Sequence, residues 1–135
     1  MHNVKYWMFA VGVGMAAMAG SAIAAMPKGN AAKGQQVFAR CAACHKVGPN
    51  AAGGMGPALN GVVGRAAGSD GGFRYSPAMK GSGIKWDEAN LDSFLLGPAK
   101  KVPGTKMTFP GMAAAQDRAD VIAFLKQYDA KGGKK

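Results

Sequence analysis

The residues Cys41, Cys44 and His45 form the pattern Cys-x-x-Cys-His, in which two thiols and an imidazole stand three and four positions apart. In a helical turn such positions share one face, with Cβ atoms about 5–6 Å apart. Both thiols can then reach the vinyl groups of one porphyrin while the imidazole turns onto its iron. The pattern therefore predicts a covalently attached haem. A thioredoxin-like disulfide between the two cysteines is the alternative, and it would leave His45 unexplained.

A second protein ligand for the iron would have to be a methionine, because His45 is the one histidine outside the predicted signal peptide. A His/Met pair raises the reduction potential of haem iron. The candidate thioethers are Met26, Met55, Met79, Met107 and Met112. Met107 is preferred, since Pro-Gly pairs on both sides stiffen its loop, and Met112 is the runner-up although it is expected in the core. Met55 is expected to pack within its loop, and Met79 to line the haem pocket.

The segment 1–24 has the composition of a secretory signal peptide. Lys5 supplies a positive charge, residues 6–19 are largely apolar, and small residues precede a cut expected after Ala24. The folded domain would then be residues 25–135, exported to the periplasm. The alternative is an uncleaved membrane anchor, since residues 6–26 have about the 20 residues needed to cross a bilayer.

Charge and length restrict the class of protein. The chain has 135 residues, which suits one domain, and 17 basic against 7 acidic residues give a formal net charge of +10. A basic surface attracts partners with acidic faces. Nucleic acid is disfavoured as a partner, because no base-reading motif or aromatic stacking platform accompanies the scattered basic residues.

The elements that position the motif are predicted to be helices. Asn30 is a candidate N-cap for a helix that runs into the Cys-x-x-Cys-His pattern, and residues 46–64 form a loop rich in Gly and Pro. Asp87 caps a second helix that ends at Gly97-Pro98. A third helix spans about residues 113–130 and leaves Lys134-Lys135 as a solvated tail. We expect an all-α domain in which the first and last helices cross.

Several motifs together resemble those of class I c-type cytochromes, similar to mitochondrial cytochrome c and its bacterial periplasmic relatives. The resemblance covers Lys33 to about Tyr128. It is carried by residues 41–45, 56–61, 64–65, 72–75, 83–86 and 103–109. It implies the cytochrome c fold, with three to five short helices wrapped around one covalently bound haem c.

The resemblance also implies a role for each matched residue. Cys41 and Cys44 would form thioether bonds to the haem, and His45 and Met107 would be the axial ligands of its iron. The Pro57 carbonyl would accept a hydrogen bond from His45. The remaining matched residues would surround the haem: Tyr75, Trp86 and Thr105 would hydrogen-bond a propionate, Arg65 would balance its charge, and Phe109 would shield the exposed haem edge.

Three positions depart from the mitochondrial type of the family. Phe94 stands where that type has a tyrosine, Met79 where it commonly has an asparagine, and Ala99 where it has a basic residue. We therefore expect a drier pocket on the Met107 side of the haem, with an altered potential. The expected docking ring consists of Arg40, Lys46, Lys100, Lys101 and Lys106.

The resemblance implies a monomeric one-electron carrier of a respiratory or related electron-transport chain, rather than an enzyme. Its donor would be a quinol-oxidising complex, and its acceptor a terminal oxidase, a photosynthetic reaction centre or a peroxidase. A haem peroxidase and a five-coordinate gas sensor are the alternatives, and both require an iron site that Met107 does not fill.

Overall fold

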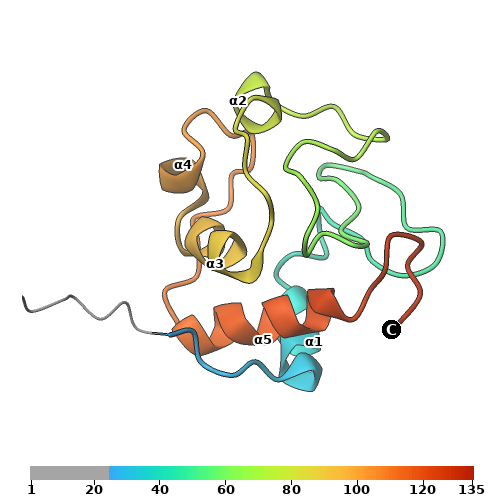
Figure 1. Cartoon of the computed structure of the whole chain (residues 1–135), viewed down its shortest axis with the longest axis vertical. Helices are drawn as coiled ribbons and strands as arrows, with labels where there is room; N and C mark the ends of the chain where they lie inside the picture. Colours follow the sequence, from blue (N-terminus) through green and yellow to red (C-terminus); the bar gives the residue numbers. More distant parts are fainter. Residues whose placement is uncertain (1–24) are drawn as a thin grey trace, which may run out of the picture.

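The computed structural model describes residues 25–135, so the predicted signal peptide lies outside the described residues. Its helices are α1 (Ala31–Phe38), α2 (Pro77–Lys80), α3 (Glu88–Leu96), α4 (Pro98–Lys101) and α5 (Ala115–Lys126) (Figure 1). Only Gly97 separates α3 from α4, and loops join the other helices. Extended pairing within residues 25–135 is limited to two isolated bridges, Ala66 with Lys85 and Tyr128 with Lys134. This confirms the all-α prediction. In the same range, the helices are too short or too polar to cross a membrane.

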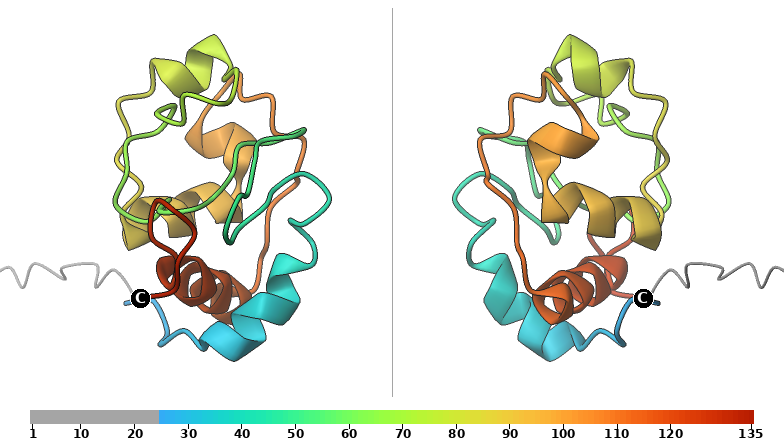
Figure 2. Two further views of the ribbon diagram at one scale, coloured as in Figure 1. Left: turned by 90° about the vertical axis from the view of Figure 1, so that its right-hand side faces the viewer. Right: turned by 90° about the vertical axis from the view of Figure 1, so that its left-hand side faces the viewer.

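The first and last helices cross, as predicted (Figure 2). Asn30 caps α1 by accepting the Lys33 N–H at 3.0 Å. Gly34 lies at the crossing, where a Cβ would overlap the carbonyl oxygen of Asp120 in α5. Phe38 and Phe124 pack beside it with ring centroids 5.2 Å apart. The crossing therefore depends on a residue without a side chain at the point of closest approach.

Helix α1 ends at Phe38, before the Cys-x-x-Cys-His pattern, so the prediction that it runs into the pattern is wrong in its boundary. Beyond Phe38 the chain continues as tighter turns, in which the Cys41 N–H donates to the Phe38 carbonyl at 2.8 Å. One α-type bond then joins the His45 N–H to the Cys41 carbonyl at 2.9 Å. The Cys41 carbonyl also accepts the Cys44 N–H at 3.1 Å, and the two bonds together preserve the local helical spacing of the three reactive side chains.

Helix α3 begins and ends where the sequence predicts. The Asp87 side chain accepts the Asn90 N–H at 2.7 Å, and the helix stops before Gly97. The short helices α2 and α4 were not predicted. Each has proline at its first position, where the missing N–H costs no hydrogen bond.

Helix α5 is shorter than predicted, because the chain turns back at Gln127 and forms a hairpin of residues 127–135. The Lys135 N–H donates to the Gln127 carbonyl at 2.8 Å, and the Asp129 N–H to the Gly133 carbonyl at 2.9 Å. The side chains of Lys134 and Lys135 are exposed, but their backbone is not a free tail.

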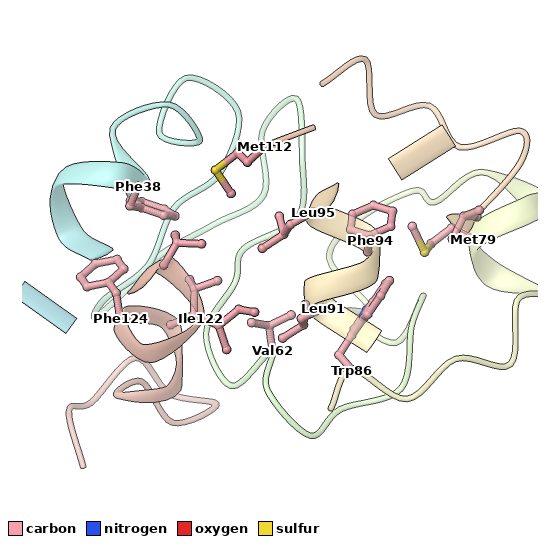
Figure 3. Close-up of a cluster of buried hydrophobic side chains, with 13 residues drawn as sticks. Phe38, Val62, Met79, Trp86, Leu91, Phe94, Leu95, Met112, Ile122 and Phe124 are labelled. Atoms are coloured by element: carbon pink, nitrogen blue, oxygen red, sulfur yellow. The ribbon is translucent and has the colours of Figure 1, made fainter. Parts of the chain in front are cut away.

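The hydrophobic core lies between α5, α3 and the loops that follow α1. Figure 3 shows two parts of it: Phe38, Phe124 and Ile122 near the helix crossing, and Trp86, Phe94 and Met79 farther along α3 towards α2. The second part forms a wall of the site described next.

Candidate haem site

One cavity of about 520 Å³ collects all of the predicted site residues. They are Cys41, Cys44, His45, Pro57, Arg65, Tyr75, Trp86, Thr105, Met107 and Phe109. The cavity lies within the size range of small-molecule and cofactor sites. These residues come from segments far apart in the sequence, and the fold brings them around one space.

The imidazole of His45 is held by the loop that follows it. Its Nδ1 lies 2.8 Å from the Pro57 carbonyl oxygen, which can only accept. Nδ1 therefore carries the proton, and Nε2 has a free lone pair for a metal. Burial lowers the pKa of His45, with the Arg65 charge acting in the same direction, while the bond to Pro57 opposes the shift. The neutral, metal-binding form of the imidazole is thereby favoured.

Gly56 provides the space for this ring. A Cβ at Gly56 would lie 2.5 Å from Cε1 and 2.8 Å from Nδ1 of His45. The Gly56 N–H donates to the Cys44 carbonyl at 2.9 Å, which ties the loop to the Cys-x-x-Cys-His pattern. No role for Gly56 is predicted from the sequence, although a glycine directly before Pro57, the predicted partner of His45, is a visible signal.

The rest of the same loop is also closed by hydrogen bonds. The Asn60 side chain accepts the Gly48 N–H at 2.8 Å and donates to the Gly48 carbonyl at 2.9 Å. Arg65 donates to the carbonyls of Asn60 and Ala58, both at 3.0 Å. Arg65 thus braces the loop that carries Pro57, a role beyond the predicted one of balancing the charge of a propionate.

The two cysteines are half-buried, and both line the cavity. The Cys44 N–H donates to the Cys41 carbonyl at 3.1 Å, so a tight turn separates them. Burial raises the pKa of the Cys41 thiol, with the nearby Arg40 charge opposing the shift.

The five candidate methionines occupy different places. Met112 is buried in the core, as expected, and like Met26 it is absent from the cavity wall. Met55 is 83 % exposed, so the expectation that it packs within its loop is wrong; the glycines around it leave its side chain in solvent. Met79 lines the cavity, as expected, and Met107 does so from the 102–112 segment.

The segment that carries Met107 is held in place mainly by hydrogen bonds to residues that follow the methionine. Locally, the Met107 N–H donates to Thr105 Oγ1 at 3.3 Å. Farther on, the Met112 N–H donates to the Leu95 carbonyl at 2.8 Å. Buried Arg118 donates to the Met112 and Ala113 carbonyls at 2.8 and 3.0 Å and pairs with Asp92 at 2.7 Å. The sequence offered no signal that Arg118 and Asp92 pair.

The cavity wall next to α3 is apolar. Met79 and Phe94 are 9 % and 7 % exposed, and the Trp86 ring lies 5.0 Å from the Phe94 ring between centroids (Figure 3). Hydroxyl groups occur at its margins. Tyr75 accepts the Asp70 N–H at 3.2 Å and keeps its own proton free to donate.

The mouth of the cavity carries part of the expected docking ring. Arg40 and Lys106 line the cavity, and Arg40 also pairs with Asp117 at 3.3 Å. Lys101 donates to Asn90 Oδ1 at 3.0 Å. Lys46 and Lys100 are exposed.

The residues present fit a covalently attached haem. The cavity offers two thiols, an imidazole whose Nε2 is free, a thioether, and apolar side chains for a porphyrin. These are the donors that hold haem c in proteins.

The sequence profile of the family described as Cytochrome c matches residues 31–129. The chain belongs to the cytochrome c family. It is 55 % identical over 101 residues to cytochrome c2 of Rhodoblastus acidophilus, which covers 75 % of this chain and 94 % of that protein. It is 44 % identical over 135 residues to cytochrome c-554 of Methylosinus trichosporium, which covers the whole of both.

A solved structure of the same family is similar. Cytochrome cH from Methylobacterium extorquens shares 49 % identity and a TM-score of 0.68, covering 73 % of this chain and 98 % of that one. Family membership confirms the predicted fold, a covalently attached haem c, and an electron carrier rather than an enzyme.

Proposed function

We propose that this cytochrome carries single electrons through a haem c that is bonded to Cys41 and Cys44 and ligated by His45 and Met107. When bound, the haem supplies an iron that changes by one electron between its ferric and ferrous forms. The observation that carries the proposal is the 2.8 Å contact between His45 Nδ1 and the Pro57 carbonyl, in a cavity that Met107 also lines. This contact leaves Nε2 of His45 free to bind the iron.

Each protein ligand comes from a segment that is held independently of the other. The loop around Pro57 fixes the imidazole of His45, and the bonds at Met112 and Arg118 fix the loop of Met107. Ligands that keep their places in both oxidation states keep the reorganisation on electron transfer small. With both in place, no position remains for a substrate, which separates a carrier from a peroxidase or a gas sensor.

The remaining matched residues complete the surroundings of the haem. Tyr75, Trp86 and Thr105 would bond a propionate, and Arg65 would balance its charge from the position in which it braces the Pro57 loop. Half-buried Phe109 would shield the exposed haem edge.

The basic residues at the cavity mouth would steer partners with acidic faces. The donor class is a quinol-oxidising complex, and the acceptor classes are a terminal oxidase, a photosynthetic reaction centre and a peroxidase. Steered association is fast at low salt and slows as salt rises. The protein would act as a monomer in the periplasm after residues 1–24 are removed as a signal peptide.

The deciding experiment is an absorption spectrum of the ferric holoprotein. A methionine sulfur bound to ferric haem iron gives a weak near-infrared band, which we expect in the parent protein and expect to be lost in Met107→Leu. Met79→Leu is the matched control, because its buried side chain lines the same cavity, and Met55→Leu is a control for an exposed methionine at the edge of that cavity. Both should keep the band.

Other outcomes would contradict the proposed ligation. Loss of the band in Met79→Leu but not in Met107→Leu would make Met79 the ligand. A parent protein without the band at neutral pH would have an open or differently filled iron site, and peroxide turnover and gas binding would then be measured.

A further inference from the structure

The 127–135 hairpin folds back against the loop on the His45 side of the cavity. In Figures 1 and 2 it lies beside the loops that follow α1, at the end of α5. Its turn is closed from within, since Asp129 Oδ1 accepts the N–H groups of Lys131 and Gly133 at 2.8 and 3.0 Å. The cation of Lys134 also lies 5.9 Å from the centre of the Tyr128 ring. The hairpin is therefore a defined structure.

The contact between hairpin and loop is too close for a side chain. A Cβ at Gly132 would overlap the Gly48 carbonyl oxygen and lie 2.7 Å from Asn60 Nδ2. From the opposite side, a Cβ at Gly61 would lie 2.9 Å from the Cα of Ala130. Gly132 also has a φ of +83°, a backbone conformation that glycine adopts without strain.

The atoms that Gly132 touches belong to the hydrogen bonds that close the Pro57 loop. Gly48 and Asn60 are joined to each other by two bonds, and Arg65 binds the carbonyls on both sides of Leu59. Pro57 directly precedes this braced stretch, and its carbonyl accepts the proton of His45 Nδ1. A short path of close contacts and hydrogen bonds, with the side chains of Asn60 and Arg65 as its links, thus runs from the hairpin to the Pro57 loop that holds the imidazole.

We infer that the hairpin, through Gly132, is a positioning element that holds the Pro57 carbonyl against His45. The inference rests on the proposed role of His45 as an iron ligand. Displacing the hairpin would lengthen the bond between Nδ1 and Pro57. Because that bond makes the imidazole a better donor, its loss would weaken stabilisation of the ferric state and raise the reduction potential.

The test compares three glycine substitutions in the reduced holoprotein. Gly132→Ala is the active variant. Gly133→Ala is the neighbouring control, since its Cβ would meet only the flexible Asp129 side chain, at 3.0 Å. Gly83→Ala is the control for backbone strain, with a φ of +68° and open space around its Cβ. Deletion of residues 132–135 tests the same contact if Gly132→Ala does not fold.

The readout is hydrogen exchange of the His45 Nδ1 proton, measured by NMR with labelled histidine, together with the reduction potential. We expect exchange to accelerate by about tenfold in Gly132→Ala, beyond what its global unfolding free energy explains, and the potential to rise. The two controls should resemble the parent protein.

Equal exchange and equal potential in Gly132→Ala and Gly133→Ala would overturn the inference. The near-infrared band of the parent protein separates this result from a failure of the proposed function. If the band is present while the exchange rates are equal, only the role of the hairpin is refuted. If the parent protein lacks the band, the ligation by Met107 is refuted, whatever the exchange rates are.

Discussion

The two segments that flank the cavity are stabilised in different ways. The segment that follows His45 is closed by hydrogen bonds within about twenty residues, as seen for His45 with Pro57 and for Gly48 with Asn60. The segment that carries Met107 has two local bonds, from the Met107 N–H to Thr105 Oγ1 and from the Thr105 N–H to the Val102 carbonyl, and otherwise depends on distant residues of α3 and α5. The hydrogen bonds of the histidine side are thus mainly local, with the 127–135 hairpin packed against them, whereas those that hold the methionine side are mainly tertiary.

This difference suggests how each side responds to change. A local network fails when one of its close contacts is disturbed, whatever happens to the rest of the fold. A segment held from a distance fails when its anchor is removed, even if the anchor touches no haem atom.

Arg118→Leu should have the largest effect. It removes the pair with Asp92 and leaves the Met112 and Ala113 carbonyls without their donor. We expect a loss of about 3 kcal/mol in the free energy of unfolding, measured with guanidinium, because one partner of a largely buried ion pair is removed. The near-infrared band should also disappear at a lower pH than in the parent protein, because the Met107 segment is loosened.

The double variant Asp92→Leu/Arg118→Leu is the control for charge. It should recover part of the unfolding free energy, since no unpaired carboxylate remains, but it should not restore the pH at which the band is lost. Full recovery of both would show that Arg118 does not anchor the Met107 segment.

Gly56→Ala should act on the histidine side alone. The new Cβ would lie 2.5 Å from the His45 ring, so the ring or the loop must move. We expect the unfolding free energy to fall by about 2 kcal/mol, as for overpacking, together with a shifted potential. Gly54→Ala, with open space around its Cβ, should change neither quantity. Identical behaviour of the two variants would contradict the proposed fit.

Phe94→Tyr should alter the methionine side with little change in stability. Its hydroxyl would enter an apolar wall and could donate to the Met107 sulfur, which would then bind ferric iron less strongly. We expect the reduction potential to rise by about 40 mV, which corresponds to ~1 kcal/mol for one electron. The pH at which the near-infrared band is lost should fall. If neither quantity changes, the dry pocket has no influence on Met107.

Asp120→Asn should have the smallest effect and leave both sides of the cavity unchanged. Hydrogen bonds from the Gln116 side chain and the Asn30 N–H lower the pKa of Asp120. This contribution to stability is complete above the unfolded-state pKa and is lost as pH falls through the lower folded-state value. The unfolding free energy of the variant should therefore depend less on pH below about pH 4, with an unchanged potential.

The sequence by itself determined the parts of this protein that depend on local pattern. Cys41, Cys44 and His45 indicated haem attachment by spacing alone, and the capping residues Asn30 and Asp87 marked where helices begin. The Pro-Gly pairs around Met107 favoured it as the second ligand, and the resemblance added Pro57; the fold places both residues around the same cavity. These features could be predicted because their physical causes lie within a few residues of one another.

Tertiary structure decided what sequence patterns do not encode. The 113–130 pattern predicted a helix throughout, but the chain folds back at Gln127 because the hairpin finds its contacts at Gly48 and Asn60. Likewise, the partners of Arg118 could not be predicted, because they depend on α3 and the 107–113 segment lying beside α5 in the fold. Such contacts join residues far apart in the chain, and their energy depends on a proximity that only the folded backbone creates.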